Sequence, residues 1–194
     1  MDQDAGSTRG ADRLASQFLI AMPALEDPNF SQTVTLICEH TDEGAMGIIV
    51  NRPTEVSLGD LFRHLSLQIG EGSPESEAIY AGGPVQRERG FVLHPSGQEW
   101  DATIPITEGV ALTTSEDILA SLARGDGPAR HLVALGYAGW DAGQLEEEMA
   151  QNAWLTGPAD AGIIFDTDPS RRWRAAAAQL GVDISLLSSE TGHA

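Results

Sequence analysis

Two short apolar segments rich in β-branched residues, 33–40 and 46–51, have the turn-forming residues Thr41-Asp42-Glu43-Gly44 between them. Such segments are typical of strands, and turn-forming residues between them favour an antiparallel hairpin. This pattern constrains the fold strongly, because it specifies two paired strands early in the chain. Further strands are predicted at 18–22, 78–81, 90–94, 109–113, 130–136 and 161–165.

Helix-start signals, in which a side-chain oxygen caps the first turn, are interspersed irregularly among these strands. They lie at Ser57 with Asp60, Thr114 with Asp117, Asp141 with Gln144, and Asp168 with Pro169. Gly125 and Gly181 are natural helix stops. Strands in runs, with about four helices placed irregularly, favour a single α+β domain over a repeating parallel α/β architecture.

The third of these helices has an apolar face and an acidic face. Ala142, Leu145, Met149 and Ala153 fall on one side at helical spacing, whereas the acidic residues 146–148 are left available to water. We interpret this acidic run as a solvated helix face rather than a metal site.

Charge and cysteine content narrow the function classes. The 194-residue chain has 29 acidic and 11 basic residues, a formal charge of −18, and all its basic residues are arginines. This balance repels phosphate backbones and disfavours direct nucleic-acid binding. The single cysteine excludes an internal disulfide framework and the paired cysteines of common structural zinc sites, and it fits a reducing cytosol.

The first residues, MDQDAGSTRGADRLASQ, lack the basic start and apolar stretch of a secretory signal. We expect a flexible tail at 1–17 and one folded domain at 18–194. No apolar run approaches the ~20 residues that a membrane-spanning helix requires. The sequence therefore predicts a cytoplasmic protein with no membrane contact.

Cys38, Glu39 and His40 stand side by side, which raises the question of a catalytic or metal-binding cluster. On a strand, Cys38 and His40 would share the face of Val34 and Leu36, with Glu39 opposite, so the three do not converge. We favour a core cysteine over a reactive thiol. No metal or cofactor is predicted, because too few further ligands have suitable spacing.

Two glycine-containing turns offer binding chemistry beside a structural alternative. In the first, at 80–85, we favour a tight turn over a phosphate cradle, because the P-loop ending and the full GxGxxG spacing are absent. In the second, Tyr137 and Trp140 could form a binding ledge. We favour closure of the core beneath the following helix for these two rings.

Six blocks together resemble the bacterial YqgE/AlgH family: FLIAMPALEDPNF, ICEHTDEGAMGIIVNRP, YAGGPVQRERGFVLH, GVALTTSEDIL, LVALGYAGWDAGQLEEEMAQNAWL and LSSETGHA. The resemblance runs from about Phe18 to the C-terminus. It implies one α+β domain with a mixed, bifurcated and partly barrel-like sheet surrounded by helices. It supplies no catalytic residues, because the family has no established enzymatic activity and is described as a group of proposed transcriptional regulators associated with alginate production.

The candidate binding residues are chosen among the positions that resemble the family. Each is a polar, aromatic or glycine residue that lies in a loop or at the end of an element. They are His40, Asn51, Arg52, Gly82, Gly83, Thr113, Thr114, Tyr137, Trp140, Asn152 and Trp154. The favoured function is a non-enzymatic regulatory or binding protein that contacts an unknown protein or small ligand. One alternative is a transcription factor that binds DNA directly, which would require a local basic patch. The only evident material for such a patch is Arg52, Arg87 and Arg89, together with Arg171, Arg172 and Arg174. For the last three we favour a solvated helix face, or half of a protein contact, over a DNA reader. Another alternative is a hydrolase with His40 or His94 as its base.

Overall fold

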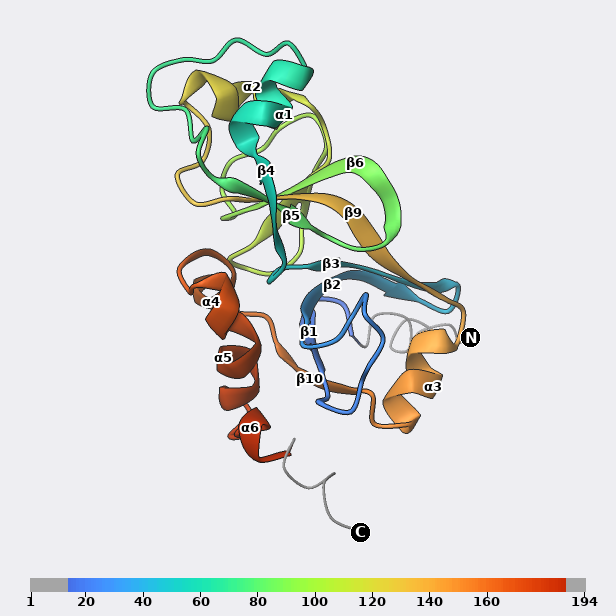
Figure 1. Ribbon diagram of the computed structural model, residues 1–194. Coiled ribbons are helices and arrows are strands. Elements are labelled where there is room, and N and C mark those ends of the chain that lie inside the picture. The colour runs from blue at the N-terminus through green and yellow to red at the C-terminus, as the bar shows by residue number, and fades with distance from the viewer. Residues whose placement is uncertain (1–13, 188–194) are drawn as a thin grey trace, which may run out of the picture.

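The computed structural model describes residues 14–187 and forms an α+β fold around one curled sheet (Figure 1). Its strands are β1 (Gln17–Ala21), β2 (Val34–Thr41), β3 (Gly44–Ile49), β4 (Pro53–Ser57), β5 (Ala78–Ala81), β6 (Val85–His94), β7 (Thr103–Pro105), β8 (Ala111–Thr113), β9 (Leu132–Asp141) and β10 (Trp154–Pro158). Its helices are α1 (Leu58–His64), α2 (Asp117–Arg124), α3 (Gln144–Ala150), α4 (Ala161–Phe165), the 3-10 turn η1 (Pro169–Arg171), α5 (Arg172–Ala178) and α6 (Ile184–Leu187).

The long strand β9 organises the sheet, whose main order is β10-β1-β2-β3-β9-β6-β8-β7. The second half of β9 pairs antiparallel with β3, from Ala138 to Asp141. Its first half pairs in parallel with β5 through Ala134 and Leu135, and β5 pairs in turn with β4. The sheet therefore divides into two branches beside β9, as the family resemblance implied.

Three groups of buried side chains hold the elements together. The largest lies between the sheet and helices α4 to α6, and it includes Phe18, Leu36 and Ile164. A second packs α1 and α2 against the β6 and β9 region through Phe62 and Leu122, and a third lies beneath α3. Figure 1 shows α1 and α2 at one end of the molecule, α3 at the other, and α4 to α6 along one side.

The predicted hairpin is confirmed: β2 and β3 are antiparallel, and Thr41 is paired with Gly44 across the turn. The strand predicted at 161–165 is wrong, because this segment is α4. The side chain of Asp160 accepts a hydrogen bond from the Ile163 amide at 3.0 Å and so begins a helix. Strands β4, β7 and β10 were not predicted, and residues 14–187 contain six α-helices rather than about four.

A β-bulge corrects the predicted face of His40. The pairing of β2 with β3 shifts between Ile37 and Glu39, so Cys38 is the additional residue. Cys38 still packs against the largest core, as expected, but His40 is now opposite Ala45 on the face that packs beneath α3. Side chains alternate between the two faces of a regular strand. The extra residue of a bulge shifts this alternation by one, so every later side chain points to the opposite face from the one predicted.

The helix starts agree with the sequence to different degrees. Ser57 and Asp60 form a complete capping box, and Asp168 caps η1 with Pro169 in its first turn. At α3 only half of the box is present, since the Gln144 side chain accepts from the Asp141 amide at 3.0 Å. Thr114 does not cap α2, which begins at Asp117.

No helix within residues 14–187 is long and apolar enough to cross a bilayer.

Candidate functional site

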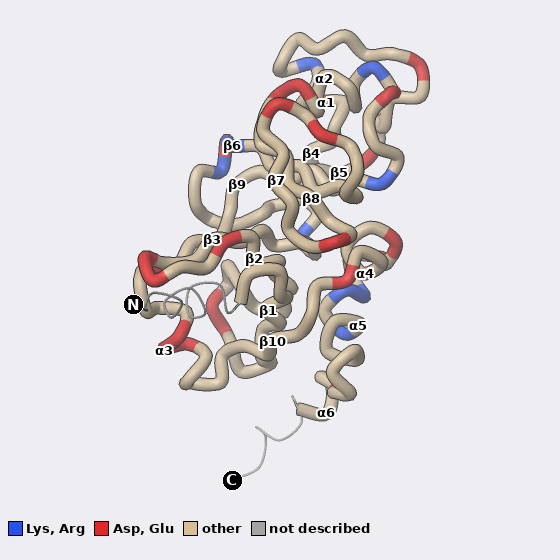
Figure 2. The backbone as a smooth tube through the Cα atoms, turned by 180° about the vertical axis from the view of Figure 1, so that it is seen from behind, with Lys and Arg blue, Asp and Glu red and all other residues tan. Residues whose placement is uncertain are grey.

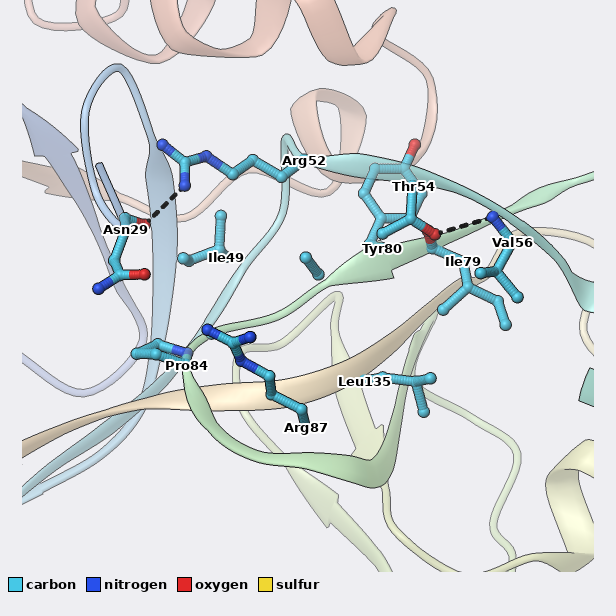
Figure 3. Close-up of a pocket in the computed structure, with 12 residues that line it drawn as sticks. Asn29, Ile49, Arg52, Thr54, Val56, Ile79, Tyr80, Pro84, Arg87 and Leu135 are labelled. Carbon is cyan, nitrogen blue, oxygen red and sulfur yellow. Dashed lines mark hydrogen bonds between the residues drawn. The ribbon is translucent and has the colours of Figure 1, made fainter.

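A cavity of about 400 Å³ lies where the sheet divides, and we call it the fork cavity (Figure 3). Its apolar wall consists of Ile49, Val56, Ile79, Ala81, Pro84 and Leu135. Two arginines, Arg52 and Arg87, complete the lining with Asn29, Thr54, Tyr80 and Gly83. The cavity falls within the size range of small-ligand sites, and such sites are mostly apolar with a few polar groups.

The topology explains why space remains at this place. Ile49 ends the β3 branch, whereas Ile79 and Ala81 belong to the β5 branch. The chain crosses between the branches at residues 50–52, and a hydrogen bond from the Ile49 amide to the Gly82 carbonyl, at 2.8 Å, joins the end of β3 to the residue after β5. Side chains from diverging strands cannot interdigitate as they do on a continuous sheet, so a hollow forms between them.

Arg52 fixes one side of the fork cavity. Its Nη1 donates to the carbonyls of Pro28 and Asn29, at 2.7 and 2.9 Å, and its Nη2 donates to that of Ser31 at 2.8 Å. Burial lowers the pKa of this guanidinium, and the Asp27 carboxylate opposes that effect. Arg52 therefore holds the loop that brings Asn29 to the cavity wall.

Arg87 presents a different guanidinium, which is exposed and lies beside Pro84 in Figure 3. Within residues 14–187 it has neither an ion pair nor a hydrogen bond, whereas Arg63, Arg124 and Arg130 each pair with a carboxylate. In this view Arg52 lies on the other side of Ile49. The fork cavity thus has one cation committed to the scaffold and one available to a ligand.

Gly82 and Gly83 allow two backbone segments to cross closely. A Cβ atom on Gly82 would lie 2.3 Å from the Gly136 carbonyl oxygen, and one on Gly83 would lie 2.0 Å from the Tyr137 carbonyl carbon. The Gly82 amide donates to the Leu135 carbonyl at 2.9 Å. Both glycines are therefore needed for the close backbone crossing, and only Gly83 lines the cavity. This arrangement is a backbone crossing and not a phosphate cradle.

Asn51 closes the corner between β3 and β4. Its Oδ1 accepts from the Val34 amide and its Nδ2 donates to the Gln32 carbonyl, both at 2.9 Å. Both ends of the amide are engaged, so this predicted binding residue acts in the scaffold beside the fork cavity.

The comparisons with known proteins agree with this architecture. The AlgH-like family model matches residues 18–185. The chain belongs to the AlgH-like family. UPF0301 proteins of Thioalkalivibrio sulfidiphilus and Methylococcus capsulatus are 54% and 51% identical to it, over 95% and 94% of this chain and 98% and 97% of theirs.

Two solved structures share the fold of this AlgH-like chain. The solution structure of the AlgH protein from Pseudomonas aeruginosa is 48% identical, with a TM-score of 0.76 over all of both chains. The crystal structure of protein DIP2367 from Corynebacterium diphtheriae is 19% identical, with a TM-score of 0.69 over 97% of this chain and 94% of that one, and it shows the fold alone.

Another group of predicted residues lies beneath α3 of the AlgH-like fold, away from the fork cavity. Trp140 and Trp154 are buried, and their indole N–H groups donate to the same oxygen of Glu148, at 2.8 and 3.2 Å. The Nε2 atom of the buried His40 lies 2.6 Å from the Glu146 carboxylate. The prediction of a wholly solvated acidic face is therefore wrong, because two of these acids attach α3 to the sheet.

Phe30 completes an aromatic cluster with these tryptophans, its ring centroid 5.8 Å from that of Trp140 and 5.6 Å from that of Trp154. Asn152 adopts a left-handed backbone conformation (φ 58°) just after α3, where its backbone N–H donates to the Met149 carbonyl. An asparagine tolerates this conformation at a helix end, which gives it a structural role.

Thr113 belongs to a buried hydrogen-bond chain. His94 Nδ1 donates to the Pro95 carbonyl at 2.9 Å, and Nε2 accepts from the Thr113 hydroxyl at 2.7 Å. The Thr113 hydroxyl in turn lies 2.7 Å from that of Thr103. Burial lowers the pKa of His94, although the Pro95 hydrogen bond opposes this. His94 and Thr113 are both fully buried, so neither side chain is exposed to solvent.

Tyr137 and Thr114 line a second groove, of about 680 Å³, that is more open to solvent than the fork cavity. The half-buried Tyr137 ring packs edge-to-face on Phe91, with centroids 5.8 Å apart. It therefore belongs to the largest core, and the prediction that it lies beneath α3 is wrong; only Trp140 lies there. Three acidic residues, Glu39, Glu43 and Asp141, and one arginine, Arg89, also line this groove. Its excess of acidic residues and its openness make it a weaker candidate for a small ligand.

Of the residues that line the fork cavity, only Arg52 and Gly83 were among the predicted binding residues. Arg87 was predicted only as potential nucleic-acid-binding charge, and Val56 and Ile79 were not predicted to belong to a site. Their common location depends on the parallel pairing of β5 with β9, which local sequence does not encode. Residues 14–187 contain no group of three or more His, Cys, Asp or Glu side chains placed to hold a metal ion.

Proposed function

We propose that the protein is a non-enzymatic regulatory protein that binds a small organic molecule in the fork cavity. The observation that carries this proposal is the combination of an apolar wall with the unpaired Arg87 in a cavity of about 400 Å³. Apolar walls provide affinity through burial, and a single polar group provides orientation and specificity.

The local geometry does not favour the hydrolase alternative. His40 and His94 are both buried, and the hydroxyl that meets His94 belongs to the equally buried Thr113. A histidine base must reach the proton that it removes from a nucleophile in contact with substrate. Neither histidine lines the fork cavity.

Direct DNA binding also gains little support. The arginines form small groups on a chain with many acidic residues (Figure 2). The predicted basic cluster on the last helices is smaller than its sequence suggests, because Arg172 is buried and donates to the Val50 and Thr167 carbonyls. The prediction of a solvated helix face is wrong at this residue.

A fragment screen by nuclear magnetic resonance tests the proposed function. We expect small amphipathic fragments to shift the amide signals of Ala81 and Gly83, and we expect Val56→Asp to weaken this binding by placing a carboxylate in the apolar wall. Ile104→Asp is the matched control, because Val56 and Ile104 are 46% and 50% exposed and only Val56 lines the cavity. If no fragment perturbs the cavity signals, the proposed function is wrong.

A further inference from the structure

We propose that the fork cavity selects an amphipathic monocarboxylate, with the carboxylate on Arg87 and the apolar part against the cavity wall. This inference rests on the proposed function and names the chemical class of its ligand.

The first argument is the state of the two cationic groups. Arg52 already donates to the carbonyls of Pro28, Asn29 and Ser31, and Asp27 lies close enough to influence its charge. Arg87 has no such partner within residues 14–187. A planar guanidinium that is not engaged matches a carboxylate well, because it can donate two parallel hydrogen bonds.

The second argument is the number of charges that the site can neutralise. The amides of Ala81 and Gly82 are already used, donating to the carbonyls of Arg52 and Leu135 at 2.8 and 2.9 Å. A polyphosphate requires several donors or a metal ion, and the chain contains no lysine. One free guanidinium therefore favours a single negative charge.

The third argument is the apolar wall. Ile49, Ile79 and Leu135 face a cavity of about 400 Å³, which a small inorganic anion would leave largely unfilled. Each methylene group that leaves water for such a wall strengthens binding roughly fourfold. A carboxylate that carries an aliphatic or aromatic part satisfies the wall and the cation together.

The overall charge of −18 makes this local arrangement more selective. The excess of acidic residues repels anions, although salt screens this effect beyond roughly 10 Å. An anion is retained only where a cation without a counter-charge lies beside an apolar surface. Arg87 at the fork cavity meets that condition.

The test uses the full chain labelled with ¹⁵N and three probes of equal chain length: octanoate, octanol and octylamine. Each is titrated below its aggregation concentration at constant ionic strength, and Kd is taken from the Ala81 and Gly83 amide shifts. We expect octanoate to bind up to about fivefold more tightly than octanol, the range given by an ion pair with an exposed guanidinium. Octylamine should bind least.

Three variants assign the effect to Arg87. Arg87→Met should reduce octanoate affinity to the level of octanol, and Arg87→Lys should retain part of the preference as a single point charge. Arg89→Met is the matched control: it removes the same charge two residues along β6, from an arginine that lies over the Phe91 ring and does not line the cavity. It should leave the octanoate Kd unchanged.

The outcomes separate the two proposals. Equal binding of octanoate and octanol, or full octanoate affinity in Arg87→Met, overturns the carboxylate assignment and leaves ligand binding in the cavity intact. If none of the three probes shifts the cavity amides while neutral fragments do, the carboxylate assignment alone fails. If fragments also have no effect, both proposals fail. The amide spectrum of each variant reports directly whether it is folded.

Discussion

The imidazole Nε2 of His131 lies 2.5 Å from the Glu77 carboxylate, although the two residues are 54 positions apart. Nδ1 of the same ring lies 2.9 Å from the Pro128 carbonyl oxygen. Burial lowers the pKa of His131, but its hydrogen bonds to Glu77 and Pro128, with the charge of Glu77, outweigh this and raise the pKa overall. The pair therefore joins the loop before β5 to the start of β9 most strongly when the ring is charged.

We predict that this pair makes stability depend on pH. A raised pKa in the folded state means that the stabilisation is complete below the unfolded pKa of about 6.5 and is lost as pH rises through the folded value. His131→Gln should therefore lower the free energy of unfolding by about 1 kcal/mol more at pH 5.5 than at pH 8.5. Urea unfolding at both pH values measures the difference.

His64→Gln is the control for this prediction, because His64 is exposed and has no ion pair or hydrogen bond within the described part of the chain. It should change stability little at either pH. A His131→Gln effect that is equal at pH 5.5 and pH 8.5 would contradict a charged pair.

Glu148 should be essential for attaching α3. Glu148→Ala leaves two buried indole N–H groups, those of Trp140 and Trp154, without their acceptor. Because an unsatisfied buried donor costs about 1–3 kcal/mol, we expect a loss of at least about 2 kcal/mol in the free energy of unfolding. Tryptophan fluorescence during urea unfolding measures this loss and reports the altered indole environment.

Glu147→Ala is a control with the same charge change at the neighbouring position. Glu147 is exposed, so its replacement should change stability by less than about 0.5 kcal/mol. Comparable losses for both variants would mean that helix charge, and not the indole contacts, determines the effect.

The sequence predicts features that depend on neighbouring residues. The β2–β3 hairpin and the Ser57 capping box follow from a few adjacent side chains and are both present. The face of His40 was mispredicted because the bulge at Cys38 arises from pairing with another strand. The fork cavity was not predicted for the same reason. Arg87 and Val56 are distant in sequence, and only the pairing of the strands places both at one cavity.

Gly83 provides a test of the close crossing beneath the cavity. A methyl group at this position would lie 2.0 and 2.2 Å from the Tyr137 carbonyl carbon and oxygen, and 2.3 Å from the Ala138 nitrogen. Because neither backbone segment can move without disturbing the sheet, Gly83→Ala should cost about 3 kcal/mol or more. Thermal unfolding followed by circular dichroism measures the loss.

Gly90→Ala is the matched substitution, because the nearest atom to a Cβ at that site is a Leu135 methyl carbon at 4.0 Å. Gly90 lies in β6, where alanine is readily accommodated, so little change is expected. If Gly83→Ala is tolerated as well as Gly90→Ala, the two segments do not cross as closely as the structure indicates.

Cys38 should react slowly in the folded protein. The residue is half-buried, packs against the largest core, and has its thiol 3.6 Å from the Leu36 carbonyl oxygen. Burial raises the pKa of the thiol to about 12. Only about one molecule in ten thousand then carries the reactive thiolate at pH 8. Alkylation by iodoacetamide should be at least about a hundredfold slower than in urea-unfolded protein; similar rates would disprove core placement.

The last prediction concerns DNA, because the family resemblance includes proposed transcriptional regulators. Specific DNA binding commonly requires several phosphate contacts from Lys or Arg. On the last helices Arg172 is buried in the scaffold, and only Arg171 and Arg174 of that cluster remain for such contacts. We therefore expect no submicromolar, sequence-specific complex with a promoter fragment at near-physiological salt. Fluorescence anisotropy against excess unrelated duplex measures this. Specific binding that Arg171→Ala with Arg174→Ala abolishes, without loss of folding, would establish direct DNA recognition in place of regulation through another molecule.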